Sequence, residues 1–257
     1  MIKIATWNVN SIRARLPHLT KWLGDAQPDV LLLQETKVED KDFPLTAFET
    51  QHYHLVYTGQ KSYNGMAIVS RYPFTELETQ FTNHTDAARR MMAVTVNGIR
   101  IVNVYVPNGE AVGSEKFAYK LEWLHHLQQY LQGQIKKYPY VLVAGDFNVA
   151  PEGLDVYDPS EYHDCVLVSE PEREAFRSII ALGFNDSFRQ FQKESGQFSW
   201  WDYRAAAFRR NRGLRIDHIL INAALAACCR SCDIDKEPRG WERPSDHTPV
   251  FANFEIP

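Results

Sequence analysis

Short apolar runs rich in β-branched residues recur along this chain, with turn-forming residues between them. Runs of this length and composition predict buried β-strands. Eight segments fit: 2–9, 29–35, 65–71, 90–96, 99–106, 140–147, 215–222 and 248–256. Asn97-Gly98 joins two of them, and this dipeptide favours a two-residue hairpin, so we expect that part of the sheet to be antiparallel. The pattern therefore predicts a mixed sheet.

Three segments between these strands have the 3.6-residue period of an amphipathic helix: 16–26, 114–137 and 171–182. In the second, one stripe carries Phe117, Leu121, Leu124, Leu131 and Ile135, which predicts the face that packs on the core. Strands alternating with helices indicate an α/β fold. Nothing in the sequence suggests a second core, so we predict one domain over residues 1–257.

Composition excludes several classes of protein. No apolar run approaches the roughly eighteen residues that span a bilayer, and the first residues carry no basic flank or cleavage site. We therefore expect a soluble, cytoplasmic protein that does not act at a membrane. The four cysteines, Cys165, Cys228, Cys229 and Cys232, lack partners at zinc spacing. We expect them to be small buried side chains.

A net charge of -4 argues against a general nucleic-acid coat, although a local basic patch can hide in the total. Residues 204–215 contain five arginines and no acid: Arg204, Arg209, Arg210, Arg212 and Arg215. Such a run is equally typical of a solvated face and of a phosphate-binding loop.

Polar residues interrupt the strands at their ends. The set comprises Asn8, Asn10, Glu35, Tyr105, Asp146, Asn148, Asp217 and the Asp246-His247 pair. Any one of them could simply make a turn. However, Glu35 follows three leucines and a glutamine, and Asp217 interrupts an apolar run where an unpaired carboxylate would be costly. Since ligands collect at strand ends in layered α/β folds, we expect this set to form one site.

Carboxylates, amides, a tyrosine and a histidine suit a hard, oxygen-binding cation better than zinc. We expect Mg²⁺, with Mn²⁺ as an alternative, and a phosphate ester as the substrate. The competing hypothesis at this level is a serine or cysteine hydrolase. The chain has no GxSxG motif, and its cysteines have no histidine partner nearby in sequence.

Six motifs, in order, carry a family resemblance: NVNSIRAR, LLLQETKV, YVPNGE, GDFNVAP, GLRIDHIL and PSDHTPV. Together they resemble the exonuclease III family of DNA repair nucleases, within the endonuclease/exonuclease/phosphatase superfamily. The resemblance extends from Lys3 to Phe254. QETKV, RRMMA, FSWWDYR and NRGLRID distinguish this family from the lipid phosphatases of the superfamily. The fold it implies is a four-layer α/β sandwich, with two mixed sheets packed face to face and helices outside.

The resemblance also implies roles for the strand-end residues. Glu35, with Asn8 and Asp246, resembles the Mg²⁺ site. Asp217 matches the acid that orients His247, which contacts the scissile phosphate.

Asp146 is implied to carry the proton, while Asn148 and Tyr105 hold the phosphoryl oxygens. Water attacks in line without a covalent intermediate, leaving a 3′-hydroxyl and a 5′-phosphate. Whether His247 or Asp146 is the general base stays open.

The DNA contacts implied by the resemblance are Arg90, Lys116, Lys120, Trp200, Trp201, Arg204, Arg209, Arg210 and Arg212. Adjacent strand residues face opposite ways, so we expect Trp200 and Trp201 to differ, one of them packing in the core. Arg215 lies in the strand beside Asp217. We therefore expect it to be a buried partner of other side chains and not a phosphate contact.

The function implied is a Mg²⁺-dependent phosphodiesterase of base excision repair that acts as a monomer and has 3′-5′ exonuclease, 3′ end-processing and abasic endonuclease activities. Its partner is duplex DNA with abasic sites, nicks or blocked 3′ ends. One alternative is an enzyme restricted to 3′ exonuclease and end cleaning. Another is a catalytically inactive nucleic-acid-binding regulator on the same fold.

One segment departs from the family pattern. Leu167 stands where a small residue is usual in enzymes that cut abasic sites, and Val168 stands where phenylalanine is usual. Together with Trp200 and Leu214, these residues would line the abasic pocket. A bulky Leu167 predicts weak abasic-site cleavage, unless this loop is shifted or displaced.

Overall fold

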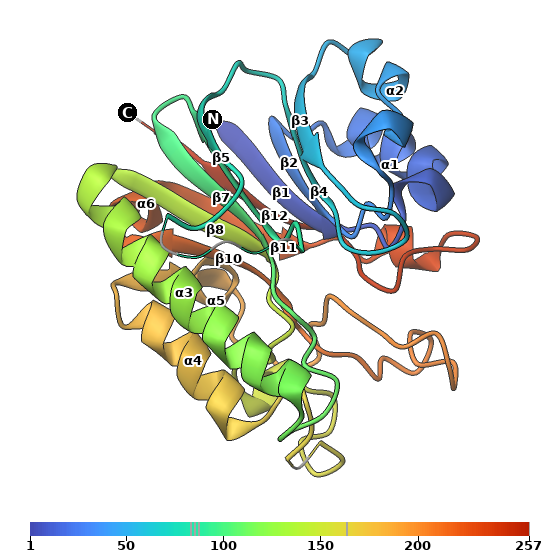
Figure 1. Ribbon diagram of the computed structural model, residues 1–257. Coiled ribbons are helices and arrows are strands. Elements are labelled where there is room, and N and C mark those ends of the chain that lie inside the picture. Colours follow the sequence, from blue (N-terminus) through green and yellow to red (C-terminus); the bar gives the residue numbers. More distant parts are fainter. Residues whose placement is uncertain (83, 85, 87, 163, 257) are drawn as a thin grey trace.

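Two six-stranded mixed sheets pack face to face, with helices on the outer faces (Figure 1). The computed structural model describes residues 1–256 except 83, 85, 87 and 163, so the predicted one-domain boundary at residue 257 lies just outside it. The four-layer α/β sandwich is confirmed.

The first sheet contains, in spatial order, β11 (Cys229–Ile234), β12 (Val250–Phe254), β1 (Ile2–Asn8), β2 (Val30–Gln34), β4 (Met66–Ser70) and β3 (His54–Thr58). The second contains β5 (Thr75–Glu78), β6 (Met91–Val96), β7 (Ile99–Tyr105), β8 (Tyr140–Asp146), β10 (Asp217–Asn222) and β9 (Phe184–Asp186). β1 with β2 and β7 with β8 are parallel, whereas the other described neighbours are antiparallel.

The predicted hairpin is confirmed between β6 and β7. Asn97 and Gly98 both have positive φ, 47° and 79°, as a type I′ turn requires.

Central strands are apolar on both faces because both faces are covered. In β2, Val30 and Leu32 enter the core between the sheets. Leu31 and Leu33 instead pack toward α1 (Ile12–Ala26) and α2 (Thr46–Glu49). This double burial explains why the central strands read as continuous apolar runs rather than alternating ones.

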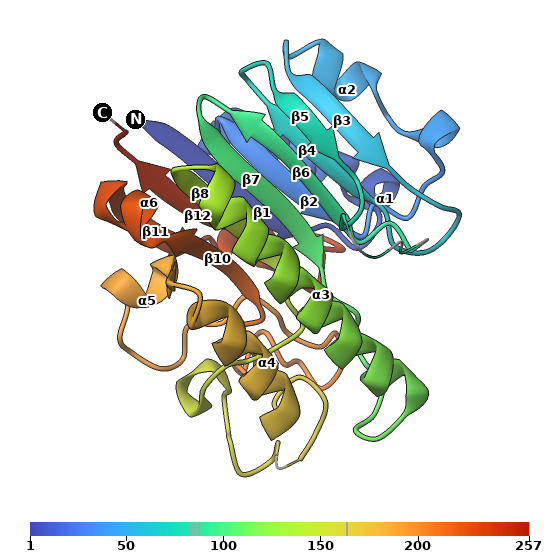
Figure 2. The ribbon, with the colours of Figure 1, turned by 60° about the vertical axis from the view of Figure 1, so that its left-hand side comes forward.

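The outer face of the second sheet is covered by α3 (Glu115–Lys137) and α4 (Glu170–Ile180), which lie side by side in Figures 1 and 2. Ser114 caps α3 by accepting a hydrogen bond from the Phe117 backbone N–H at 3.1 Å. Of the predicted stripe on α3, Phe117, Leu124 and Leu131 are buried, whereas Leu121 and Ile135 are partly buried. The predicted helices thus have nearly the observed bounds. The exception is α1, which begins at Ile12, four residues before the predicted start, and contains Pro17.

The remaining helical segments are short: α5 (Ser187–Phe191), α6 (Ala223–Cys228) and three 3₁₀ turns at Asp40–Asp42, Gly153–Asp155 and Glu237–Gly240. None of the helices in the described part of the chain is long and apolar enough to cross a membrane. Cys228, Cys229 and Cys232 are buried as expected. Cys165 is exposed, so the expectation of burial was wrong for it, because it lies in the surface segment that precedes α4.

Candidate active site

Six strand ends meet at one edge of the sandwich and carry the polar set. β1 is parallel to β2 and β7 to β8, and the hydrogen bond between Asn8 and Asp146 brings the ends of both pairs to this edge. The antiparallel β10 and β12 start there, so Asp217 pairs with Asp146 in register. The side chains line one cavity of about 160 Å³, formed by Glu35, Tyr105, Asn108, Asp146, Asn148, Leu167, Trp200, Ile216, Asp246 and His247. The structure therefore brings most of the predicted site residues together.

His247 is held by Asp217. Its Nδ1 lies 2.9 and 3.1 Å from the two Asp217 carboxylate oxygens. Ser199 donates from Oγ to the same carboxylate at 2.6 Å and fixes its orientation. Burial lowers the pKa of His247, but the charges of Asp217 and Asp146 outweigh burial and raise it to about 10. The two carboxylates therefore favour the protonated imidazole, and Nε2 is the ring nitrogen that faces Asp146 in the cavity.

Asp146 lies opposite His247 and is buried. Its Oδ2 is 3.7 Å from His247 Nε2, and its Oδ1 accepts a hydrogen bond from the Asn148 backbone N–H at 2.9 Å. Burial raises the pKa of Asp146, His247 opposes that effect, and Asp217 and Glu35 add to it, giving about 7. A carboxyl group with a pKa near neutrality is suited to moving a proton in either direction.

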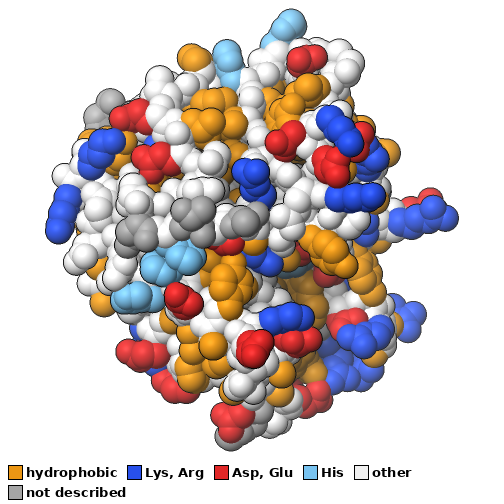
Figure 3. Space-filling view, in the orientation of Figure 1, with side chains coloured by type: hydrophobic (Ala, Val, Ile, Leu, Met, Phe, Trp, Pro, Cys, Tyr) orange, Lys and Arg blue, Asp and Glu red, His pale blue; other side chains and the backbone are white. Residues whose placement is uncertain are grey.

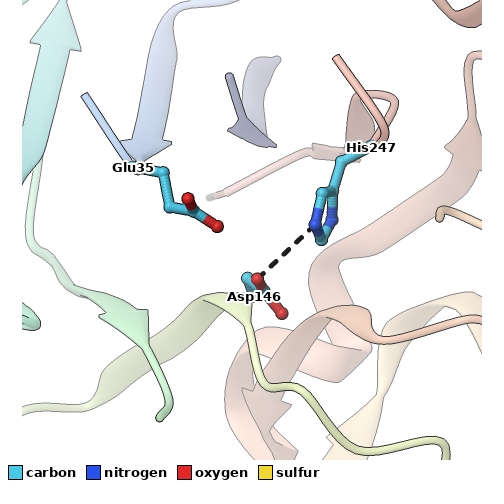
Figure 4. Close-up of side chains that lie close together, drawn as sticks. All are labelled: Glu35, Asp146 and His247. Atoms are coloured by element: carbon cyan, nitrogen blue, oxygen red, sulfur yellow. Dashed lines mark ion pairs between the residues drawn. The ribbon is translucent and has the colours of Figure 1, made fainter. Parts of the chain in front are cut away.

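Glu35, Asp146 and His247 point toward one another (Figure 4), with their ligand atoms within 4.8 Å. Two carboxylates that converge on one point supply the hard oxygen donors that Mg²⁺ prefers. This donor set fits the cation expected from the sequence. It adds Asp146, which we expected only to carry the proton.

Asn8 and Asp246 are the other two residues expected at the cation. The Asn8 amide nitrogen donates to Glu35 Oε1 at 2.8 Å and to Asp146 Oδ2 at 2.9 Å, while its oxygen accepts from the Asn10 backbone N–H. Asp246 accepts from Asn10 at 2.8 Å and from Trp200 at 3.0 Å. Here Asn8 organises the two carboxylates and Asp246 lines the same cavity, so a direct ligand role for either stays a prediction.

Tyr105 and Asn148 border the cavity from β7 and from the segment after β8. Burial, together with the charges of Glu35 and Asp146, raises the pKa of Tyr105 far above its ordinary value, so its hydroxyl stays a donor. Arg90 stacks over the Tyr105 ring at 4.4 Å. Asn148 donates to the Val106 carbonyl at 3.0 Å and accepts from Asn108 at 3.3 Å.

Two residues expected to contact DNA are fully buried. Lys120 has no exposed surface because its ammonium group pairs with Glu172 inside the protein. Trp201 packs against Phe208 and donates to Asn211 at 3.2 Å. These placements correct the expectation of DNA contact for both residues. Trp200, in contrast, lines the cavity, so the two tryptophans differ, as expected from the alternation of strand residues.

The remaining expected DNA contacts lie on the surface. Lys116 is exposed and pairs with Glu110 at 3.2 Å. Arg209 and Arg210 are exposed, whereas Arg204 pairs with Asp202, and Arg212 with Glu161. Lys and Arg side chains gather on the lower right of Figure 3, where Figure 1 draws the 201–212 segment in orange.

Arg215 is the buried partner that we expected. It bonds to Asp155 at 2.7 Å and to Asp186 at 2.8 Å, behind the strand that carries Asp217. It therefore supports the site from inside the protein.

Leu167 is buried and lines the active-site cavity with φ of 78°, a backbone region that side-chain-bearing residues rarely adopt. Val168 and Leu214 are also buried, but they pack in a cluster beside the cavity and do not line it. The expected abasic-pocket lining is therefore corrected for these two residues. Val168 faces a separate surface hollow, because consecutive residues on this segment point in different directions.

Four polar residues at the site were not singled out from the sequence. Asn108 and Ser199 touch the site as described above, and Lys37 pairs with Glu35 Oε2 at 2.8 Å. Tyr203 accepts from Asn10 at 3.3 Å on the exposed rim. Lys37 and Asn108 lie inside the QETKV and YVPNGE motifs, which could have indicated them. Ser199 and Tyr203 lie inside the FSWWDYR motif, which could have indicated them as well.

Comparison with known proteins agrees with this geometry. Residues 5–247 match the model of the Endonuclease/Exonuclease/phosphatase family. Exodeoxyribonuclease III of Haemophilus influenzae is 35% identical, with 98% of this chain and 100% of the relative covered. An exodeoxyribonuclease of Bacillus subtilis is 32% identical, covering 97% and 98%.

Two solved structures are similar over all of both chains. The 3′ phosphatase NExo from Neisseria, bound to a product DNA hairpin, has 43% identity and a TM-score of 0.98. An AP endonuclease from Archaeoglobus fulgidus has 40% identity and a TM-score of 0.96. The chain belongs to the endonuclease/exonuclease/phosphatase family and, within it, to the exonuclease III group of DNA repair nucleases.

Proposed function

We propose that this protein is a Mg²⁺-dependent phosphodiesterase that processes the 3′ ends of duplex DNA in base excision repair and incises internal abasic sites poorly. The observation that carries the proposal is the placement of His247 Nε2 opposite the carboxylates of Glu35 and Asp146 in one small cavity. We further propose that it acts as a monomer in the cytoplasm, on DNA with nicks or blocked 3′ ends.

Several side chains of the protein bind and stabilise the reacting phosphate. His247, oriented by Asp217, donates from Nε2 to a nonbridging phosphate oxygen, and Tyr105 and Asn148 hold the other phosphoryl oxygens. Such prearranged donors stabilise the negative charge that builds up in the transition state. The cation, when bound, neutralises part of that charge and orients the phosphate.

Asp146 transfers the proton in this reaction. Water attacks phosphorus in line, the bond from phosphorus to O3′ breaks, and O3′ leaves protonated as the 3′-hydroxyl. Asp146 either accepts the proton of the water, while solvent protonates O3′, or donates a proton to O3′, while the proton of the water goes to solvent. Asp146 Oδ2 lies 3.7 Å from His247 Nε2, in the same cavity as Glu35.

The names of the relatives do not decide between 3′-end processing and abasic incision. Similar structures are named 3′ phosphatase and 3′-5′ exonuclease at 43% identity, and AP endonuclease at 40% identity. Leu167 favours the first activity, because its side chain fills part of a cavity that would have to admit a flipped-out, base-free sugar. A catalytically inactive binding protein is disfavoured, because it would not need Asp146, Asp217 and His247 to be buried and held by hydrogen bonds at one site.

Leu167→Gly is expected to raise incision of an internal abasic site by about tenfold or more relative to 3′-end processing. The change enlarges the cavity and removes packing of a buried side chain, and glycine adopts a φ of 78° without strain, which offsets part of the stability lost. The two rates would be compared on labelled duplexes. Val168→Ala is the matched control, because it truncates the neighbouring buried side chain outside the cavity. If both variants leave the ratio of the rates unchanged, Leu167 does not restrict abasic cleavage.

Arg209→Gln is expected to weaken duplex binding about equally for all sequences and to reduce the slope of log affinity against log salt by roughly one unit. The reason is that Arg209 is an exposed cation of the arginine loop and would neutralise one phosphate. Arg230→Gln, on β11 at the opposite end of the first sheet, is the control and should leave the slope unchanged. An unchanged slope for Arg209→Gln would favour the alternative that the run of arginines is only a solvated face.

A further inference from the structure

A buried ion pair joins α3 to α4 beneath the active-site cavity. Lys120 and Glu172 are both fully buried, and their side chains are in direct contact. Taking two charges out of water carries a large desolvation cost, and a buried pair is tolerated only when further hydrogen bonds satisfy it. The partners of this pair are therefore informative.

All the additional partners of the pair beneath the cavity are backbone groups or a capping residue. Lys120 Nζ donates to the carbonyl of Asn148 at 2.6 Å and to the carbonyl of Asn108 at 3.1 Å. Glu172 accepts from the backbone N–H of Leu167 at 2.9 Å. Asn108, Asn148 and Leu167 lie on three separate segments, and all three line the active-site cavity. One ion pair thus ties together three parts of the cavity wall.

The two carboxylate oxygens of Glu172 have different hydrogen-bond partners. Oε2 accepts from the backbone N–H and the hydroxyl of Ser169, which completes the capping box of α4. Oε1 accepts from Lys120 and from Leu167 instead. Helix capping accounts for the Oε2 contacts only, so the Oε1 contacts need another explanation.

Leu167 is the residue that needs such support. Its φ of 78° is unfavourable for a residue with a side chain, and such a conformation persists only when its surroundings hold it. Glu172 holds its N–H, and its carbonyl accepts from the Ala150 backbone N–H at 2.7 Å. These two bonds direct the leucine side chain into the cavity.

We propose that the Lys120–Glu172 pair is a positioning device that fixes Leu167 and the Asn148 segment against the cavity and thereby excludes abasic nucleotides. This inference rests on the proposed function, in which Leu167 restricts the cavity. Neither charged group touches DNA; both act through the backbone of other residues.

The test compares Glu172→Gln, Lys120→Met and the double variant with Ser169→Ala. Ser169→Ala removes the capping hydroxyl of α4 and leaves the Oε1 contacts of Glu172 in place. It therefore controls for any loss of α4 stability in the Glu172 variants. For each protein, kcat and KM are measured on a duplex with a recessed 3′ end and on one with an internal abasic site. The double variant contains no unpaired buried charge. If either single variant does not fold, the double variant is therefore the one compared with Ser169→Ala.

We expect the pair variants to raise the ratio of abasic incision to 3′-end processing at least tenfold. On the recessed end, kcat should fall about tenfold with KM within about threefold, because the Asn148 segment shifts while the DNA-binding surface does not. Ser169→Ala should keep the ratio within about twofold of that of the unmodified protein, even if its Tm is lower.

Leu167→Gly separates the two proposals. If it raises the ratio and the pair variants leave it at the Ser169→Ala value, the positioning role is overturned and the proposed function stands. If Leu167→Gly also leaves the ratio unchanged, the positioning role is overturned together with the restriction of abasic cleavage by Leu167, while the proposed 3′-end processing is tested separately by the rate on the recessed end.

Discussion

His247→Ala and Asp217→Asn are each expected to lower kcat by about three orders of magnitude or more. Asp217 accepts from His247 Nδ1 at 2.9 Å and fixes which ring nitrogen faces the phosphate, so losing the acid misaligns the imidazole. Asparagine keeps the shape of Asp217 and removes its charge, and comparable changes in catalytic triads have effects of this size.

Because the two residues act as a unit, the double variant should be little worse than either single one. Single-turnover rates on a 3′-phosphate duplex would measure this directly. Ser199→Ala removes only the bond that orients Asp217, and it should cost far less than either change. Losses that multiply in the double variant would mean that the histidine and the aspartate contribute independently.

Glu35→Ala is expected to lower activity by about two orders of magnitude at low Mg²⁺ and to recover part of it at high Mg²⁺. The change removes one of the two carboxylates that face the cation position, and losing a ligand weakens metal affinity by at least the 10- to 100-fold typical of its supporting residues. Titration of activity with Mg²⁺ would show the shift, and Mn²⁺ binding followed by water proton relaxation gives a readout that is independent of catalysis.

Lys37→Met is a control that is expected to change metal affinity in the opposite direction. Lys37 pairs with Glu35 Oε2 at 2.8 Å and competes with a cation for that oxygen, so its removal should tighten metal binding. A Glu35→Ala protein with the metal dependence of the unmodified chain would contradict a ligand role for Glu35.

The sequence predicted the inner part of the fold and missed its borders. All eight predicted strands exist, and the four that were missed are β3, β5, β9 and β11. These are the four edge strands of the two sheets. Edge strands are short and often polar, and β5, for example, reads Thr-Glu-Leu-Glu with three exposed positions. Hydrophobic patterning detects double burial, and edge strands do not have it.

The site was predictable where a polar residue breaks an apolar strand, as Glu35, Asp146 and Asp217 do. It was not predictable where the partner lies far away in the sequence, as Glu172 does for Lys120. The error at Lys120 had a visible signal, because it lies three residues after Phe117 and four before Leu124, on the core-facing stripe of α3. Trp201 was misplaced because sequence alternation says that two neighbours differ, without saying which one is buried.

The most direct test of the account is to incubate the unmodified protein and Mg²⁺ with two labelled duplexes, one with a recessed 3′ end and one with an internal abasic site. We predict that the 3′ end is processed at least about tenfold faster and that EDTA abolishes both reactions. Abasic incision at a rate comparable to 3′-end processing, or cleavage that persists in EDTA, would contradict it.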